Sequence, residues 1–297
     1  MRPRWTKRHA ALEQAIWAET RRRFVERSPV PSTVYHYTNL PAAISILESH
    51  CLWLTHQDHF EDKRETRHVH GVVLDACNEL FLCHRDAPSE GLLKRFVDRY
   101  PEVMARQSPI FIASCSDTPA VEHLWQKYAA DYSGCCIGFP AGVIDDHSDR
   151  RLPTLGFPVI YSADAQRAWV QELFDWLLQR QPWDGVAEET VLQHMAMTAA
   201  FVSFGYKDVG FAPEQEWRLV GWPHGSGVAV IESPKPHVDW QIDYGKLLNL
   251  HSIHVGHRAQ GGLESVRSVL TQLRYGEKGM PPMPKLIEHP SQSSPQR

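Results

Sequence analysis

The strongest constraint on the fold is a short strand-type segment that passes directly into a helix. Residues 34–38 form a β-branched and aromatic run with His36 at its centre. Thr38 or Asn39 can then cap a helix, and Pro41 suits the first helical turn. A strand packs apolar side chains readily without an imidazole. A histidine between two aromatic rings therefore indicates a place where something polar and flat is held.

Strand-type and helix-type segments are mixed along the rest of the chain. They do not follow a regular strand–helix–strand alternation, so the pattern predicts an α+β fold. Further helices are expected near residues 5–27, 72–81, 92–100, 121–128, 164–180, 187–202 and 263–273, and strands near residues 51–55, 109–116, 134–139, 159–161, 215–220, 227–231, 250–255 and 284–287.

No internal repeat or linker divides the sequence. The simplest organisation is an N-terminal helix over residues 1–30 that packs on the domain, then a single α+β domain of catalytic type over residues 31–287. The polar residues 288–297 are expected to form a disordered tail.

Composition limits the classes of function. The chain has 297 residues and a formal net charge of −4, which argues against a broad electrostatic grip on nucleic acid but not against a local one. It has six cysteines without a CxxC pair, no apolar stretch of membrane-spanning length and no signal-peptide pattern. A reduced cytoplasm is the expected location, with no membrane partner.

A charged segment at residues 214–218 is a candidate functional element. If it is a strand, Glu214, Glu216 and Arg218 share one face, while Trp217 faces the core on the other. Two carboxylates beside a guanidinium can position one carboxylate and keep it ionised. The alternative is an ion-pair ladder on a surface edge strand, and the spacing does not separate the two.

A third candidate combines a strand that ends at Ser114 and Ser116 with a short helix that carries Trp125 and Tyr128. The residues are spaced to form an aromatic wall for a planar ligand, with hydroxyl groups at the strand end. The alternative, favoured when this segment is taken alone, is that the aromatic rings only fill the core.

Metal and thiol sites are weakly indicated. His251, His254 and His257 imitate ligand spacing, but they have no acidic neighbour and lie in a strand context, so no metal is expected. Cys115 or Cys136 lacks any local nucleophile signature, and a buried, inert thiol fits better. The chain has no P-loop or dinucleotide-binding glycine pattern.

Taken together, these segments resemble a widespread bacterial family of unknown function. The family pattern is matched in order by residues 35–38, 114–116, 125–129, 134–139 and 214–218, and the resemblance spans residues 33–275. One departure follows Phe60. The family has Asn-Asp-Pro there, whereas this chain has Glu61, Asp62 and Lys63, so contacts that need the Asn or Pro do not carry over.

A second resemblance is to the ADP-ribosyltransferases, including the DNA-modifying toxins. Residues 36–47 resemble their first strand and helix, and the order His36, Trp125 or Tyr128, Glu216 resembles their site. It implies a split mixed or antiparallel sheet with flanking helices, and NAD as substrate without a metal. Glu216 is then the catalytic residue, and the NAD-binding residues are His36, Tyr37, Thr38, Ser114, Ser116, Trp125, Tyr128, Glu214 and Arg218.

The resemblance implies ADP-ribosyl transfer to a macromolecular acceptor, protein or nucleic acid, in phage defence or as a toxin. A non-catalytic module that binds a nucleotide or peptide in the same cleft is the first alternative, and a thiol- or metal-dependent hydrolase is the second. The enzyme hypothesis requires His36, an aromatic ring from residues 125–128 and Glu216 to line one pocket.

Overall fold

The computed structural model describes most of the chain. The described residues are 11–23 without 13, 17 and 21, then 31–59, 63–83, 88–104, 110–141, 154–180, 186–221, 229–232, 235–241, 250–278 and 280–289. The expected start of the first helix, the variant Glu61 and Asp62, the turn after Gly221 and tail residues 290–297 lie outside these ranges.

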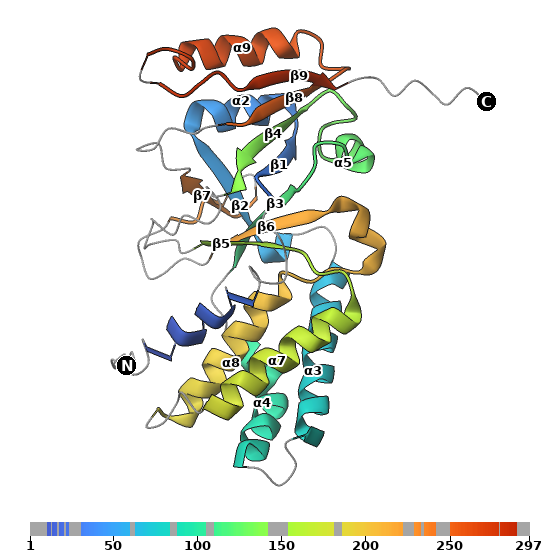
Figure 1. Ribbon diagram of the computed structural model, residues 1–297, viewed down its shortest axis with the longest axis vertical. Helices are drawn as coiled ribbons and strands as arrows, with labels where there is room; N and C mark the ends of the chain where they lie inside the picture. The colour runs from blue at the N-terminus through green and yellow to red at the C-terminus, as the bar shows by residue number, and fades with distance from the viewer. Residues whose placement is uncertain are drawn as a thin grey trace, which may run out of the picture. The chain divides into compact units, whose positions relative to one another are not determined.

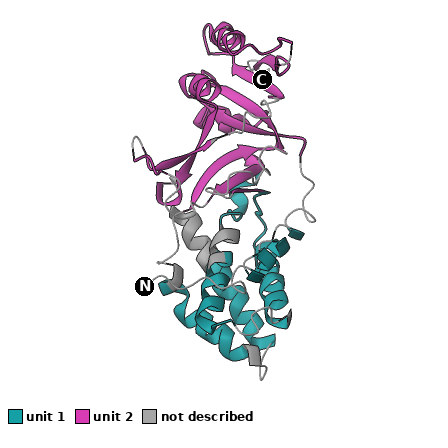
Figure 2. Ribbon diagram, turned by 90° about the vertical axis from the view of Figure 1, so that its left-hand side faces the viewer, with its two compact units in different colours: residues 1–29, 60–109, 157–212 teal, residues 30–59, 110–156, 213–297 magenta. Residues whose placement is uncertain are grey.

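Figure 2 shows that the chain divides into two compact units. The helical unit comprises residues 1–29, 60–109 and 157–212, and the sheet unit comprises residues 30–59, 110–156 and 213–297. Each unit is assembled from three separate stretches of chain. The expected organisation into one α+β domain with an N-terminal helix and a tail stays a prediction.

Figure 1 shows the long helices of the helical unit side by side, and contacts link α3 to α7 and α4 to α8. Apolar side chains at helical spacing form their core, including the fully buried Phe96, Trp169 and Phe174. The four expected helices of this unit are present: α3 (Lys63–Cys83), α4 (Pro88–Met104), α7 (Ala163–Arg180) and α8 (Glu188–Ser203).

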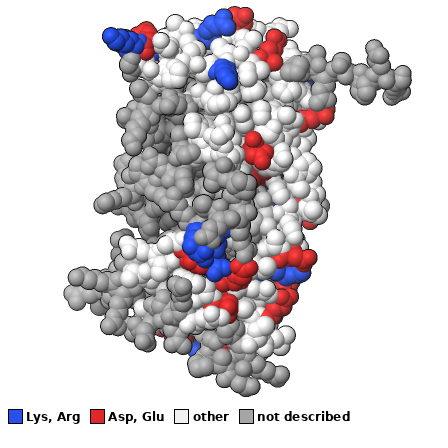
Figure 3. Space-filling view, in the orientation of Figure 1, with Lys and Arg blue, Asp and Glu red and all other residues white. Residues whose placement is uncertain are grey.

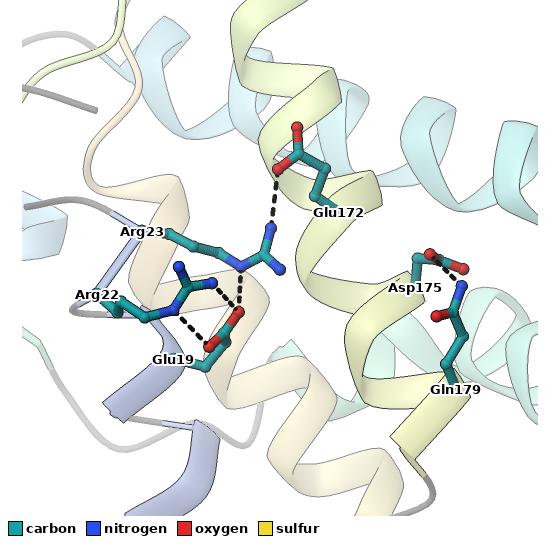
Figure 4. A network of polar contacts seen from close by, with 6 residues as sticks. All are labelled: Glu19, Arg22, Arg23, Glu172, Asp175 and Gln179. Carbon is teal, nitrogen blue, oxygen red and sulfur yellow. Dashed lines mark hydrogen bonds and ion pairs between the residues drawn. The ribbon is translucent and has the colours of Figure 1, made fainter. Parts of the chain in front are cut away.

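A polar network joins the N-terminal segment to α7 (Figure 4). The Glu19 carboxylate accepts hydrogen bonds from Arg22 at 2.9 and 2.6 Å and from Arg23 at 2.7 Å. Arg23 also donates to Glu172 of α7 at 2.8 Å. The Glu19 side chain is only 11% exposed, so the network holds a nearly buried carboxylate in its charged form.

The sheet unit contains a mixed sheet, which with the helices confirms the α+β class. Its order is β5-β6-β3-β1-β4-β8-β9, with β2 bound to β3 and to β7. β9 runs parallel to β8, whereas β1, β3, β4, β6 and β8 pair antiparallel. The strands are β1 (Thr33–Thr38), β2 (Cys51–His56), β3 (Phe111–Ser116), β4 (Cys135–Pro140), β5 (Thr154–Pro158), β6 (Glu216–Gly221), β7 (His237–Gln241), β8 (Ser252–Gly256) and β9 (Lys285–His289).

Each face of the sheet carries its own apolar cluster. The α2 face packs Val34, Ile137 and Trp217 with side chains of α2 (Leu40–Ser49) and α9 (Gly262–Gln272). The α5 face packs Tyr37 and Cys136 with Trp125 of α5 (Glu122–Lys127). Because side chains alternate along a strand, the register assigns every strand residue to one of these two faces.

The expected junction of strand and helix is present. The Asn39 side chain accepts a hydrogen bond from the Ala42 amide at 2.8 Å, so Asn39 rather than Thr38 is the N-cap. Pro41 lies in the first turn, and His50 caps the end of α2 with a left-handed φ of 64°. The short-range signals of this segment therefore predict its structure correctly.

Two expectations for strands are wrong. The segment near residues 159–161 is only an isolated bridge from Ile160 to Tyr206, and the strand precedes it as β5. The expected hairpin between residues 215–220 and 227–231 is absent from the described residues, since β6 pairs with β3 and β5 and Ile231 only bridges to His237. Strand β7 was not expected, and β9 continues through His289.

None of the helices in the described part of the chain is long and apolar enough to cross a membrane. On the face drawn in Figure 3, Lys and Arg side chains adjoin Asp and Glu side chains, and the described residues form no broad patch of one sign there.

The Glu19 network predicts a pH dependence of stability. Its hydrogen bonds, first that from Arg22, lower the pKa of Glu19 below its usual value of 4.5. The charged form thus stabilises the fold above pH 4.5, and this contribution is lost as the pH falls through the lowered pKa. We expect Glu19→Gln to cost about 1–2 kcal/mol of unfolding free energy at pH 7 and much less at pH 3, measured by urea denaturation.

Asp164→Asn is the matched control. The Asp164 carboxylate also binds an arginine three residues away, but its side chain is 87% exposed, so its removal costs less than about 1 kcal/mol. An equal loss for Glu19→Gln at both pH values contradicts the electrostatic account.

Candidate functional site

Adjacent strands place five of the ten expected site residues on one face of the sheet. Ser116 of β3 lies opposite Tyr35 of β1 on one side and opposite Glu216 of β6 on the other. Ser114 lies opposite Arg218 in the next row. Opposed side chains share a face, so the two serines, Glu216 and Arg218 all belong to the α5 face, as does Tyr37.

A buried ion pair is the centre of this group. The Arg218 guanidinium donates two hydrogen bonds to the Glu216 carboxylate, from Nε at 2.8 Å and from Nη2 at 3.1 Å. The two side chains are 4% and 5% exposed. The alternative of a surface ion-pair ladder is therefore excluded for this pair.

Glu214 is not part of the strand, contrary to the expectation that it shares a face with Glu216. It is the last residue of the short 3-10 helix η2 (Val209–Glu214), and Gln215 has a left-handed φ of 46°. The Ser116 hydroxyl donates to the Glu214 carbonyl at 2.8 Å, and the Asp117 amide donates to the Gln215 carbonyl at 3.0 Å. These bonds fix a turn that interrupts the strand alternation.

The turn brings Glu214 to a residue that sequence reasoning missed. His123 Nε2 lies 3.2 Å from Glu214 Oε1, and the two side chains are 43% and 7% exposed. His123 is the second residue of α5, two positions before Trp125. Its partner is 91 residues away in the chain, so no local pattern signals the pair.

Tyr37 and Trp125 anchor the loop that leads into α5. The Tyr37 hydroxyl donates to the Thr118 carbonyl at 2.8 Å and accepts from the Val121 amide at 3.2 Å, and burial raises its pKa. Trp125 is fully buried, packs edge-on against Tyr37 and donates from Nε1 to the Pro119 carbonyl at 2.8 Å. The core-filling alternative therefore describes Trp125.

Tyr128 is the exposed aromatic residue of this helix. It is 43% exposed, follows α5 directly, and has the Lys127 ammonium 4.8 Å from its ring centroid. Of the two aromatic residues proposed for ligand stacking, Tyr128 is the one whose ring reaches solvent.

His36 lies on the opposite face from Glu216. It is opposite Ile137 of β4, which belongs to the α2 face, and Thr38 follows it on that face. Its Nδ1–H donates to the Ser114 carbonyl at 3.0 Å, and burial lowers the pKa of the ring, so the imidazole is neutral. The structure places His36 and Glu216 on opposite faces of the sheet, so the requirement that both line one pocket is not met.

The thiols of the sheet are poor nucleophiles. Burial raises the pKa of Cys115 to about 12 and the pKa of Cys136 well above its usual range. Within the described part of the chain, no group of three or more His, Cys, Asp or Glu is placed to hold a metal ion. The geometry therefore gives the hydrolase alternative no support.

A comparison with family models matches residues 124–219 to a family described as a protein of unknown function, DUF2971. This stretch begins within α5 and ends within β6, so it includes Trp125, Tyr128, Glu214, Glu216 and Arg218. Neither the curated proteins nor the solved structures contain a match to the chain. The chain is thus similar, over less than half its length, to a domain family of unknown function.

Tyr37 provides a test of how α5 is held. We expect Tyr37→Phe to lower the unfolding free energy by about 1–2 kcal/mol, because it leaves the buried Val121 amide and Thr118 carbonyl without their partner. Tyr128→Phe, a control at an exposed ring, should stay within about 0.5 kcal/mol of the wild type. Equal effects in urea denaturation would show that the hydroxyl does not anchor the loop.

Thiol labelling tests the alternative of a thiol-dependent hydrolase. In the native protein at pH 8, iodoacetamide should modify the exposed Cys83 and leave Cys115 and Cys136 unmodified. Peptide mass spectrometry measures the modified fraction of each, and labelling in urea confirms that every thiol is detectable. Rapid native labelling of Cys115 or Cys136 would reopen the thiol hypothesis.

Proposed function

We propose that the chain transfers ADP-ribose from NAD to a macromolecular acceptor, protein or nucleic acid, on the α5 face of the sheet. One observation carries the proposal. A buried carboxylate, Glu216, is held by Arg218 at 2.8 Å beside the serines of the neighbouring strand. This is a buried negative charge held in a fixed position by a guanidinium, on the segment whose sequence resembles the late motif of ADP-ribosyltransferases.

The chemistry fits a carboxylate of this kind. Cleavage of the nicotinamide–ribose bond develops oxocarbenium-like positive charge on the ribose, as in glycoside hydrolysis. A carboxylate that accepts a hydrogen bond from the ribose 2′-hydroxyl stabilises that charge as it forms. A guanidinium beside the carboxylate favours its ionised form. Arg218 serves either this purpose or the pyrophosphate, and no metal is needed.

The other residues take roles according to their faces. We assign Ser114 to a contact with the ribose or the nicotinamide amide and the exposed ring of Tyr128 to stacking. Ser116 is fully buried, and its hydroxyl holds the Glu214 carbonyl instead. Tyr37 and Trp125 position α5 rather than bind the ligand. His36 and Thr38 lie on the α2 face, so the proposal gives them no contact with NAD and departs from the resemblance at this point. Cytoplasmic location and a role in phage defence or as a toxin remain predictions of the resemblance.

A non-catalytic module that binds a nucleotide or peptide is the second candidate. The observation that favours the binding module is the burial of the Glu216–Arg218 pair, whose side chains are at least 95% buried and share two hydrogen bonds. A buried pair of this kind also occurs as a purely structural element. This candidate predicts ligand binding without turnover.

The two candidates differ in what Glu216→Gln does. Wild-type protein mixed with labelled NAD and a cell lysate should release nicotinamide and label a macromolecule. Glu216→Gln should reduce both by about 10²–10³-fold, the usual effect of removing one transition-state contact. Glu264→Gln, at an exposed carboxylate of α9, is the matched control and should leave both rates unchanged.

A thermal melt of each variant separates loss of activity from loss of fold, because removing one partner of a buried pair can cost about 3–5 kcal/mol. NAD binding by calorimetry that survives Glu216→Gln, without turnover in the wild type, would favour the binding module. No turnover and no binding of NAD by the wild type contradicts the enzyme.

A further inference from the structure

We propose that His123 is the base that takes the proton from the acceptor nucleophile, with Glu214 as its positioning residue. The inference rests on the proposed transfer reaction and adds the acceptor half of it. It assigns a catalytic role to a residue that the sequence did not single out.

The first argument is the polarity of the His123–Glu214 contact. A carboxylate oxygen only accepts hydrogen bonds, so the 3.2 Å contact requires His123 Nε2 to carry the proton and donate it. In the neutral ring, Nδ1 is then the nitrogen with a free lone pair. A carboxylate on one imidazole nitrogen fixes the tautomer and makes the other nitrogen a base.

The second argument is the difference in exposure. The Glu214 side chain is 7% exposed and the His123 side chain is 43% exposed. The carboxylate is thus held within the protein, where its charge is weakly screened, while the imidazole reaches the surface where a macromolecule can approach. A purely structural ion pair needs no such asymmetry.

Both partners are also fixed close to Glu216, since Glu214 ends η2 two residues before it and His123 lies on α5, which packs on the same face of the sheet. Ser116 lies opposite Glu216, and its hydroxyl donates to the Glu214 carbonyl at 2.8 Å. The left-handed φ of 46° at Gln215 is a strained conformation for a residue with a side chain, and it turns Glu214 away from the strand. Tyr37 holds the loop before His123 on the other side.

In the transfer step, the bond from ribose C1′ to the nicotinamide nitrogen breaks, and nicotinamide leaves as a neutral molecule with the bonding pair. The acceptor atom forms a bond to C1′ with its own lone pair, and its proton passes to His123 Nδ1. The Glu214 carboxylate stabilises the resulting imidazolium. No oxidant, reductant or metal is consumed.

This assignment narrows the chemical class of acceptor. A base is required only when the attacking atom must lose a proton, as a hydroxyl, an amide or a ring nitrogen does. A carboxylate acceptor is already ionised at neutral pH and gains nothing from His123. We therefore infer an acceptor that presents an O–H or N–H group.

The experiment compares full-length wild type, His123→Ala, Glu214→Gln and a control on the same helix, Gln126→Ala. Each protein is mixed with labelled NAD and a cell lysate, and both label transfer and the KM for NAD are measured. His123→Ala should lose about 10²-fold in transfer rate with little change in KM, and added imidazole should restore part of the rate. Glu214→Gln should lose about tenfold, and Gln126→Ala should match the wild type.

Four results overturn the proposal, and they can be told apart. A wild type that neither releases nicotinamide nor transfers label refutes the transfer function and this inference with it. Normal transfer by His123→Ala refutes the inference alone. Loss of transfer in folded His123→Ala without rescue by imidazole indicates a structural role. Should His123→Ala fail to fold, normal transfer by Glu214→Gln still refutes the proposal that Glu214 positions His123 as the base.

Discussion

The sheet unit depends on one constraint: two strands share the same edge of β3. β1 meets this edge at Ser116, whereas β2 meets it at Phe111 and Ile112, and β6 occupies the whole opposite edge. The Ser114 carbonyl lies between the two contacts and accepts its hydrogen bond from the His36 ring. An unpaired carbonyl there would cost about 1–3 kcal/mol. His36 thus completes the edge where the sheet branches.

The branch also explains the positions of the candidate site residues. Because β6 pairs with β3 over its full length, Ser114 lies opposite Arg218 and Ser116 lies opposite Glu216. The Ser116 hydroxyl also fixes the turn at Glu214. A buried ion pair is weak evidence for stability, because desolvation of both charges opposes their attraction. We interpret the burial of Glu216 and Arg218 on this face as functional, in line with the proposed transfer reaction.

Patterns within a few neighbouring residues predicted local structure well. Contacts between residues far apart in the chain could not be predicted from these patterns. The strand and helix near Asn39 and the shared face of Glu216 and Arg218 depend on residues within a few positions of each other. The face of His36 depends on the register with β4, which a single sequence does not encode locally. The left-handed Gln215 and the contact from His123 to Glu214 depend on tertiary hydrogen bonds. At Glu214 these hydrogen bonds override the alternation of side chains between sheet faces that the sequence suggests.

The central claim is that the α5 face of the sheet, with Glu216 at its centre, binds NAD. A crystal structure of the full chain with a non-hydrolysable NAD analogue tests it most directly. The account predicts the ribose next to the nicotinamide within hydrogen-bond distance of Glu216, with Ser114 and Tyr128 beside the ligand. An analogue bound on the α2 face beside His36, or bound nowhere on the sheet at saturating concentration, would contradict the account.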